Sequence, residues 1–221
     1  MDHRPIGVFD SGLGGLTAVR ELMQLLPRED IIYFGDTARV PYGVRSPETI
    51  LKFARQDMNF LCSYDLKAVV IACGTVSTTS LSTLRREYHL PIIGVVEPTA
   101  AQAARVTRSG RIGLIATAAS IRSGAYEKKI AARRPGATVY GKACPLFVPL
   151  VENGRFQMGD PVIETIAREY LQSMQEADVD TLILGCTHYP LLSDVIRHIM
   201  GPDVTLINSG REAARALQAL L

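Results

Sequence analysis

The segment Val70-Ile71-Ala72-Cys73-Gly74-Thr75 joins an apolar run to a cysteine, a glycine and a threonine. A similar segment, Leu182-Ile183-Leu184-Gly185-Cys186-Thr187, occurs later in the chain. Each has the pattern of a buried β-strand with a cysteine and a threonine just after its end. The recurrence favours two related half-molecules, although short similarities of this kind also arise by chance among α/β strands.

Similar apolar runs recur along the rest of the chain. We expect strands at residues 6–9, 31–34, 68–72, 92–96, 112–116, 138–140, 181–184 and 204–207. Apolar residues at helical spacing lie between them, as at residues 16–26 and 163–174, the latter after a helix start at Asp160-Pro161. Ser209 and Glu212 have the spacing of a capping box for a final helix. This alternation predicts an α/β fold with mostly parallel sheets.

The pattern also predicts how the chain divides. We place a boundary near Pro98, so that residues 1–97 together with 204–221 form a first α/β domain and residues 98–203 a second. In open α/β sheets, ligands bind outside the carboxyl ends of the strands. We therefore expect an active site in the cleft between the two domains, built from residues that directly follow strands.

Composition excludes several classes of protein. The chain has 221 residues with 24 Lys and Arg against 22 Asp and Glu, and no Trp, so neither a basic nucleic-acid surface nor a base-stacking platform is expected. No apolar run approaches the roughly 20 residues of a membrane span. The first residues carry no signal-peptide pattern. We expect a cytoplasmic protein that binds a small molecule rather than nucleic acid or membrane.

The four cysteines, at 62, 73, 144 and 186, lack the spacing of a zinc site, and disulfides are rare in the cytosol. Cys73 and Cys186 each lie between a strand and an expected helix start, where the helix dipole would lower a thiol pKa. We interpret this pair as reactive. Cys62, after the helical pattern of residues 50–61, and Cys144, before Pro145, are interpreted as buried and inert.

Asp10 and His188 each lie close to a strand end that faces the same cleft, and each could hold or accept a thiol proton. A lone Asp after a strand is often only a helix cap, and a lone His is often structural. Residues 10–15 (DSGLGG) superficially resemble a dinucleotide-binding loop, but the third glycine of that motif is replaced by Thr17. We instead expect these glycines to let backbone N–H groups approach a small carboxylate.

Four longer segments resemble the glutamate racemases of the aspartate/glutamate racemase superfamily. They are residues 5–17 (PIGVFDSGLGGLT), 35–43 (GDTARVPYG), 144–152 (CPLFVPLVE) and 184–192 (LGCTHYPLL). The resemblance extends over essentially the whole chain. It implies two α/β domains with the active site between them, a cytoplasmic homodimer, and a role in supplying D-glutamate for peptidoglycan synthesis.

The resemblance further implies a two-base mechanism without metal, pyridoxal phosphate or any other cofactor. Cys73 would deprotonate the D-isomer with help from Asp10, and Cys186 the L-isomer with help from His188. The substrate contacts that it implies are Asp10, Ser11, Pro41, Tyr42, Gly43, Gly74, Thr75, Thr117, Glu152, Thr187 and His188.

The chain departs from the family pattern at two positions, with Gly74 in place of the usual Asn and Asn208 in place of the usual Asp. Gly74 removes an amide expected to bind substrate, so restoring Asn should lower the KM for glutamate. Alternatives therefore stay open: a racemase for aspartate or another small acid, a binding or regulatory protein that has lost turnover, and, more remotely, a nicotinamide enzyme. The short stretch before the first strand also argues against activation by a peptidoglycan precursor.

Overall fold

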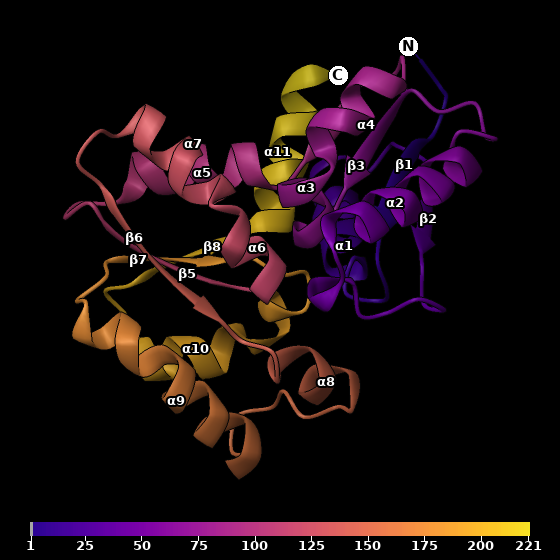
Figure 1. Ribbon diagram of the computed structural model, residues 1–221. Coiled ribbons are helices and arrows are strands. Elements are labelled where there is room, and N and C mark those ends of the chain that lie inside the picture. Colours follow the sequence, from indigo (N-terminus) through magenta and orange to yellow (C-terminus); the bar gives the residue numbers. More distant parts are fainter. Residues whose placement is uncertain (1) are drawn as a thin grey trace.

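The computed structural model, in which residues 2–221 are described, contains two four-stranded parallel sheets (Figure 1). The first sheet has the order β2-β1-β3-β4, with β1 Ile6–Asp10, β2 Ile31–Gly35, β3 Ala68–Ile71 and β4 Ile92–Gly94. The second has the order β6-β5-β7-β8, with β5 Arg111–Ala116, β6 Thr138–Ala143, β7 Thr181–Leu184 and β8 Thr205–Asn208. The predicted α/β class and all the predicted strands are confirmed.

Helices cover both faces of each sheet, which explains why the central strands are almost continuously apolar. All residues of β1, β3 and β7 are buried. The helices are α1 Leu16–Leu25, α2 Pro47–Leu61, α3 Gly74–Thr79, α4 Leu81–Glu87, α5 Val96–Val106, α6 Ala118–Ser123, α7 Ala125–Arg133, α8 Phe147–Glu152, α9 Pro161–Glu176, α10 Ser193–Met200 and α11 Ser209–Leu220, with 3-10 turns η1 Tyr42–Val44 and η2 Tyr189–Leu192. Among residues 2–221, no helix is both long and apolar enough to cross a membrane.

Two helix starts test the sequence predictions directly. The carboxylate of Asp160 accepts a hydrogen bond from the N–H of Val162 at 2.9 Å, so α9 begins where predicted. The predicted capping box of α11 is wrong. Asn208 caps that helix instead, because β8 runs directly into α11, and the hydroxyl of Ser209 donates to the carbonyl of Leu184 at 2.7 Å.

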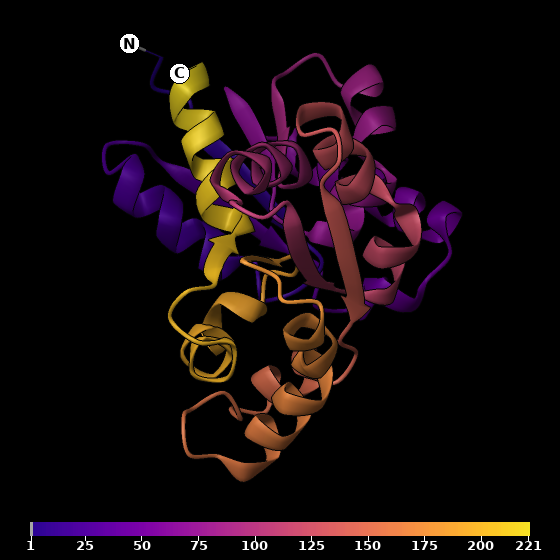
Figure 2. The same cartoon turned by 90° about the vertical axis from the view of Figure 1, so that its left-hand side faces the viewer.

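The predicted domain boundary does not match the sheets. Pro98 lies inside α5 rather than in a linker, and β8 pairs with β7 in the second sheet, so residues 205–208 do not return to the first. Only α11 returns, since it packs on α1 as well as on α5. Figure 2 shows α11, in yellow, between these helices. One apolar core that includes residues from β1, β5, α5 and α11 therefore joins the halves, which we call the first and second lobes.

Candidate active site

Cys73 and Cys186 follow the carboxyl ends of β3 and β7, one in each lobe. Both are buried, with 4% and 8% of their surface exposed. The turns that carry them are in direct contact, because a Cβ atom on Gly74 would lie 2.4 Å from the carbonyl oxygen of Gly185. With the backbone as it lies in this chain, any larger residue at position 74 would push the two turns apart. The topology thus brings together two thiols that are far apart in the sequence.

The prediction that helix starts lower the pKa of these thiols is wrong. Burial raises the pKa of Cys73 to about 11, and the nearby charge of Asp10 adds to this effect. Burial likewise raises the pKa of Cys186 to about 12. Desolvation of the thiolate outweighs the neighbouring hydrogen-bond donors, since α3 is short and only a 3-10 turn soon follows Cys186. Both thiols are therefore protonated at neutral pH.

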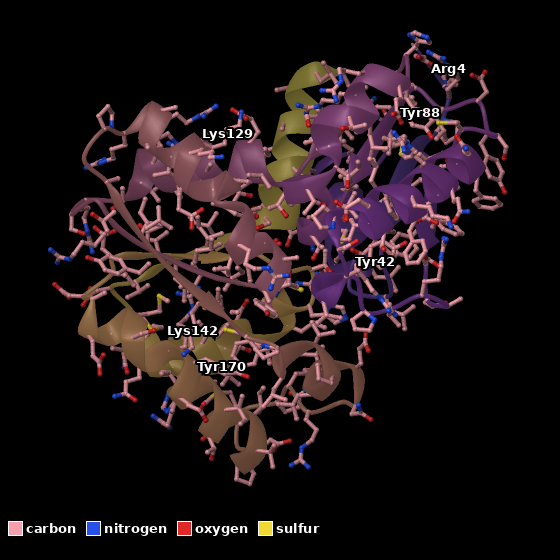
Figure 3. The ribbon with its side chains drawn as sticks, in the orientation of Figure 1. Arg4, Tyr42, Tyr88, Lys129, Lys142 and Tyr170 are labelled. Carbon is pink, nitrogen blue, oxygen red and sulfur yellow. The ribbon has the colours of Figure 1, made fainter. Side chains whose placement is uncertain are left out.

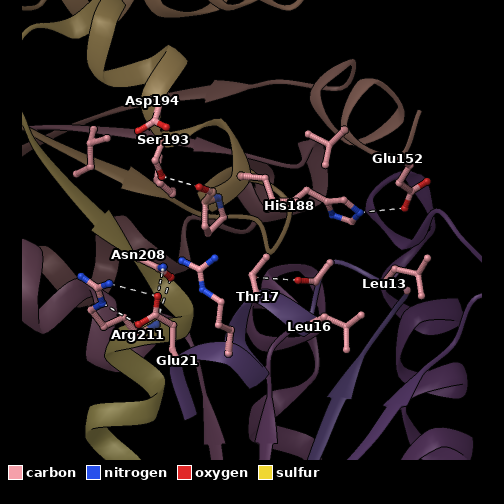
Figure 4. Close-up of a pocket in the computed structure, with 18 of the residues that line it drawn as sticks. Leu13, Leu16, Thr17, Glu21, Glu152, His188, Ser193, Asp194, Asn208 and Arg211 are labelled. Atoms are coloured by element: carbon pink, nitrogen blue, oxygen red, sulfur yellow. Dashed lines mark hydrogen bonds and ion pairs between the residues drawn. The ribbon is translucent and has the colours of Figure 1, made fainter. Parts of the chain in front are cut away.

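His188 lies between Cys186 and Glu152. Its Nδ1 atom is 3.8 Å from the sulfur of Cys186, and its Nε2 atom is 2.9 Å from Oε1 of Glu152 (Figure 4). A carboxylate only accepts hydrogen bonds, so Nε2 carries the proton and Nδ1 is left as an acceptor facing the thiol. Nothing in the sequence indicated that Glu152 pairs with His188, and the family resemblance implied that Glu152 contacts the substrate instead.

Asp10 lies at the end of β1 and is 1% exposed. One carboxylate oxygen accepts the N–H groups of Gly12 at 3.1 Å and Gly15 at 3.0 Å, and the other accepts the hydroxyl of Thr187 at 3.5 Å. Burial raises the pKa of Asp10, whereas His188, when it is protonated, and the backbone N–H groups lower it. Asp10 therefore links the first strand to the turn that contains Cys186.

The glycine-rich loop after β1 has a different role from the one predicted. Two of its N–H groups, those of Gly12 and Gly15, donate to Asp10 and are thus not free for a substrate carboxylate. A Cβ atom on Gly14 would lie 2.4 Å from the hydroxyl of Thr187 and 2.5 Å from Nδ1 of His188. The loop is glycine-rich because it packs closely against the second lobe.

Hydroxyl groups gather beside Cys73. Its thiol donates to the hydroxyl of Ser11 at 3.3 Å. The hydroxyls of Thr75 and Thr117 are 2.9 Å apart and join the two lobes. A Cβ atom on Gly43 would lie 2.9 Å from the Cβ of Thr117, so the backbone of η1 also rests on the second lobe. These groups can donate hydrogen bonds to an anionic ligand.

The side chain of Tyr42, which directly follows Pro41, lies inside the first lobe, near its boundary with the second (Figure 3). Its hydroxyl interacts with Asp36 and Asp57. Tyr42 can therefore reach a ligand only through its backbone. Of the other cysteines, Cys144 is fully buried and Cys62 follows the last residue of α2.

A cleft of about 1040 Å³ opens on the His188 side of the site (Figure 4). Its lining includes Gly14 and Thr17 of the first lobe, Glu152 and His188 of the second, and Asn208 at the far end. The two buried cysteines do not line it, so the cleft is adjacent to the reactive thiols rather than above them. Among residues 2–221, no three His, Cys, Asp or Glu side chains are grouped as metal ligands.

Comparison with known proteins places this geometry in a family. The family model described as Asp/Glu/Hydantoin racemase matches residues 6–217. The glutamate racemase of Geobacter metallireducens is 49% identical over 221 residues, which cover all of this chain and 81% of that protein. That of Streptococcus gordonii is 47% identical over 221 residues, covering all of this chain and 83% of that protein.

Solved structures agree with this assignment. The glutamate racemase isoform RacE1 of Bacillus anthracis superimposes with a TM-score of 0.95 at 41% identity, covering 100% of this chain and 82% of that one. The Francisella tularensis enzyme, solved in complex with D-glutamate, has a TM-score of 0.91 at 42% identity, with the same coverage of 100% and 82%. An aspartate racemase homologue of Pyrococcus horikoshii, at 15% identity and a TM-score of 0.68, shares the fold. The chain therefore belongs to the Asp/Glu/hydantoin racemase family and is an amino-acid racemase.

Proposed function

We propose that this chain is a glutamate racemase that interconverts L- and D-glutamate without a cofactor, using Cys73 and Cys186 as its two bases. The observation that carries the proposal is the contact between the two cysteine-bearing turns, which come from the ends of strands in opposite lobes. The relatives named glutamate racemase, at up to 49% identity over the whole chain, support glutamate as the substrate.

Inversion at one carbon requires a base on one face of the substrate and an acid on the other. A thiolate removes the α-proton, and the opposing thiol then delivers a proton to the carbanion. In our proposal, Cys186 deprotonates L-glutamate and Cys73 deprotonates D-glutamate. Each turnover leaves the two sulfurs in exchanged protonation states, so solvent exchange must restore the starting form.

His188 is suited to activate Cys186. Its Nδ1 atom accepts the thiol proton, and Glu152 stabilises the imidazolium that forms. Because burial raises the pKa of both thiols, formation of the thiolate needs help from the bound substrate. The ammonium group of glutamate supplies a positive charge that lowers the pKa of a neighbouring thiol.

Asp10 acts on the Cys73 side in this proposal. It is buried beside that thiol, and its raised pKa allows it to exchange a proton with Cys73 or with the substrate ammonium group. Ser11, which already accepts the hydrogen bond of the Cys73 thiol, is suited to relay that proton.

The substrate carboxylates need hydrogen-bond donors, which this site supplies as hydroxyls and backbone N–H groups. We assign this role to Ser11, Tyr42, Gly43, Gly74, Thr75, Thr117 and Thr187, with Pro41 shaping the loop. Neutral donors of this kind bind a carboxylate without requiring a fixed counter-charge beside the thiols.

We further propose that the enzyme is a cytoplasmic homodimer that supplies D-glutamate for peptidoglycan synthesis.

Circular dichroism of purified protein with L-glutamate, D-glutamate or L-aspartate, and no added cofactor, tests the function. We expect the signals of both glutamate isomers to decay to zero and that of aspartate to persist. In deuterated water, the product should carry deuterium at Cα while remaining substrate stays unlabelled early in the reaction, because the donor on the product side carries a solvent-derived proton. Racemisation of aspartate alone would overturn the assignment of glutamate, and early labelling of substrate would overturn the two-base scheme.

A further inference from the structure

A buried cluster of charged groups lies behind Tyr42. Arg39 pairs with two carboxylates, its Nε atom 2.6 Å from Asp36 and its Nη2 atom 2.6 Å from Asp57. The hydroxyl of Tyr42 contacts both carboxylates and is 2.8 Å from Oδ2 of Asp57. Only 5% of Asp36 and 1% of Asp57 is exposed. None of these side chains was assigned a role in proton transfer.

The cluster is held together by more than charge. The guanidinium carbon of Arg39 lies 4.4 Å from the centre of the Phe53 ring, and the rings of Phe53 and Tyr42 are 5.5 Å apart. Arg39 and Tyr42 therefore both pack on one aromatic side chain of α2. Removing a single partner would leave a buried charge unpaired, which is strongly unfavourable.

The protonation of the two aspartates depends on the hydroxyl of Tyr42. Tyr42 has one hydroxyl hydrogen but two carboxylates within reach, so its second contact needs a proton on an aspartate. The pKa of Asp57 is raised to about 6, because burial and the charge of Asp36 raise it by more than the hydrogen bond of Tyr42 and the charge of Arg39 lower it. The same surroundings raise the pKa of Tyr42, which keeps its proton.

Contacts lead from this cluster to the reactive groups. Tyr42 opens η1, and the next residue, Gly43, lies against Thr117 of the second lobe. The hydroxyl of Thr117 bonds that of Thr75, two residues after Cys73. The Tyr42–Gly43 backbone is thus fixed by the cluster on one side and contacts the site on the other.

We propose that Arg39 and Asp57 are positioning residues of the racemase: through Tyr42 they hold the Tyr42–Gly43 backbone in the place where it binds the substrate. The inference rests on the proposed function, which assigns that backbone to substrate binding. The two residues do not touch the reacting carbon, so their loss changes the affinity for substrate more than the rate of proton transfer.

The test compares steady-state racemisation of glutamate by Asp57→Asn and Arg39→Gln with that of the wild-type enzyme. Each substitution breaks the Arg39–Asp57 pair, and Arg39 is partly exposed, so Arg39→Gln keeps the test available if Asp57→Asn does not fold. We expect KM to rise at least about fivefold, the equivalent of one lost hydrogen bond, with kcat little changed.

Asp180→Asn is the matched control. Asp180 is also a structural carboxylate, accepting the hydroxyl of Thr107 and the N–H of Arg108 at 2.7 Å each, but it precedes the amino end of β7, away from the site. It should leave KM unchanged. An unchanged KM in both test variants, or a fall in kcat alone, would overturn the positioning role. A wild-type enzyme inactive on glutamate would instead overturn the proposed function.

Discussion

Replacing Gly74 with alanine puts a methyl group into the contact between the two cysteine-bearing turns. The new Cβ would lie 2.4 Å from the carbonyl oxygen of Gly185, whereas ordinary van der Waals contact begins at 3.4 Å. The opposing atom is backbone, held by a hydrogen bond from the N–H of Gly185 to the carbonyl of Ile115 at 2.8 Å. The turns must therefore separate by about 1 Å, the difference between the two distances.

Cys73 and Cys186 are the sequence neighbours of this contact and move with it. A displacement of about 1 Å in an active site costs roughly 100-fold in rate, equivalent to about 2.7 kcal/mol of activation free energy. We expect kcat for Gly74→Ala to fall by about that factor in both directions. Asn at this position has its Cβ in the same place, so Gly74→Asn should also lose turnover. The steric cost concerns kcat, and the sequence-based expectation that Gly74→Asn lowers KM is tested separately by measuring both constants for this variant.

The assay is the decay of the circular dichroism signal of L- or D-glutamate at saturating concentration. Gly141→Ala is the matched control. Gly141 lies on β6, and a Cβ atom there would lie 3.4 Å from the flexible end of the Ile121 side chain, which is ordinary contact. It should keep wild-type kcat. If Gly74→Ala also keeps wild-type kcat, then the turns tolerate separation, and the close contact is not needed for catalysis.

The remaining predictions concern the thiols and the link between β8 and α1. Cys73→Ala and Cys186→Ala should each abolish racemisation with the fold intact, while Cys144→Ala should leave it unchanged; substantial turnover in either of the first two contradicts the two-base scheme. In the substrate-free enzyme, the rate at which iodoacetamide alkylates Cys73 and Cys186 should keep increasing beyond pH 9, because only about a thousandth of a thiol with a pKa near 11 is ionised at pH 8. A rate that levels off near pH 8.5 would show that the two pKa values are not raised. Asn208→Asp should lower the unfolding free energy by about 1 to 3 kcal/mol, because it replaces the amide that donates to buried Glu21 at 3.1 Å with a second carboxylate. Thermal unfolding measures this loss, and an unchanged midpoint would refute it.

Local sequence was sufficient for the elements and for the reactive residue types. Parallel strands buried on both faces, such as β1, β3 and β7, require continuous apolar runs, and all eight strands were predicted from short runs of this kind. The residues after these runs, among them Asp10, Cys73 and Cys186, were identified because strand ends are where α/β proteins bind ligands. The start of α9 at Asp160-Pro161 was also predictable, because a helix cap depends on only a few neighbouring residues.

What depends on distant parts of the chain was not predictable. The lowered thiol pKa values inferred from helix starts were wrong, because burial of Cys73 and Cys186 is a property of the assembled lobes. The pairing of Glu152 with His188 joins α8 to the turn after β7 and has no local signature. The departure from the family pattern at Gly74 was evident in the sequence, but its reason was not.

The sequence by itself thus determined which strands and helices form and which side chains carry the chemistry, because backbone propensity and hydrophobic periodicity act over a few residues. Tertiary structure alone decided that Gly74 lies against Gly185 and that β8 joins the second sheet while α11 returns to the first lobe. Those outcomes depend on packing between segments far apart in the chain. Steric exclusion and desolvation at such contacts are absent until the lobes have assembled.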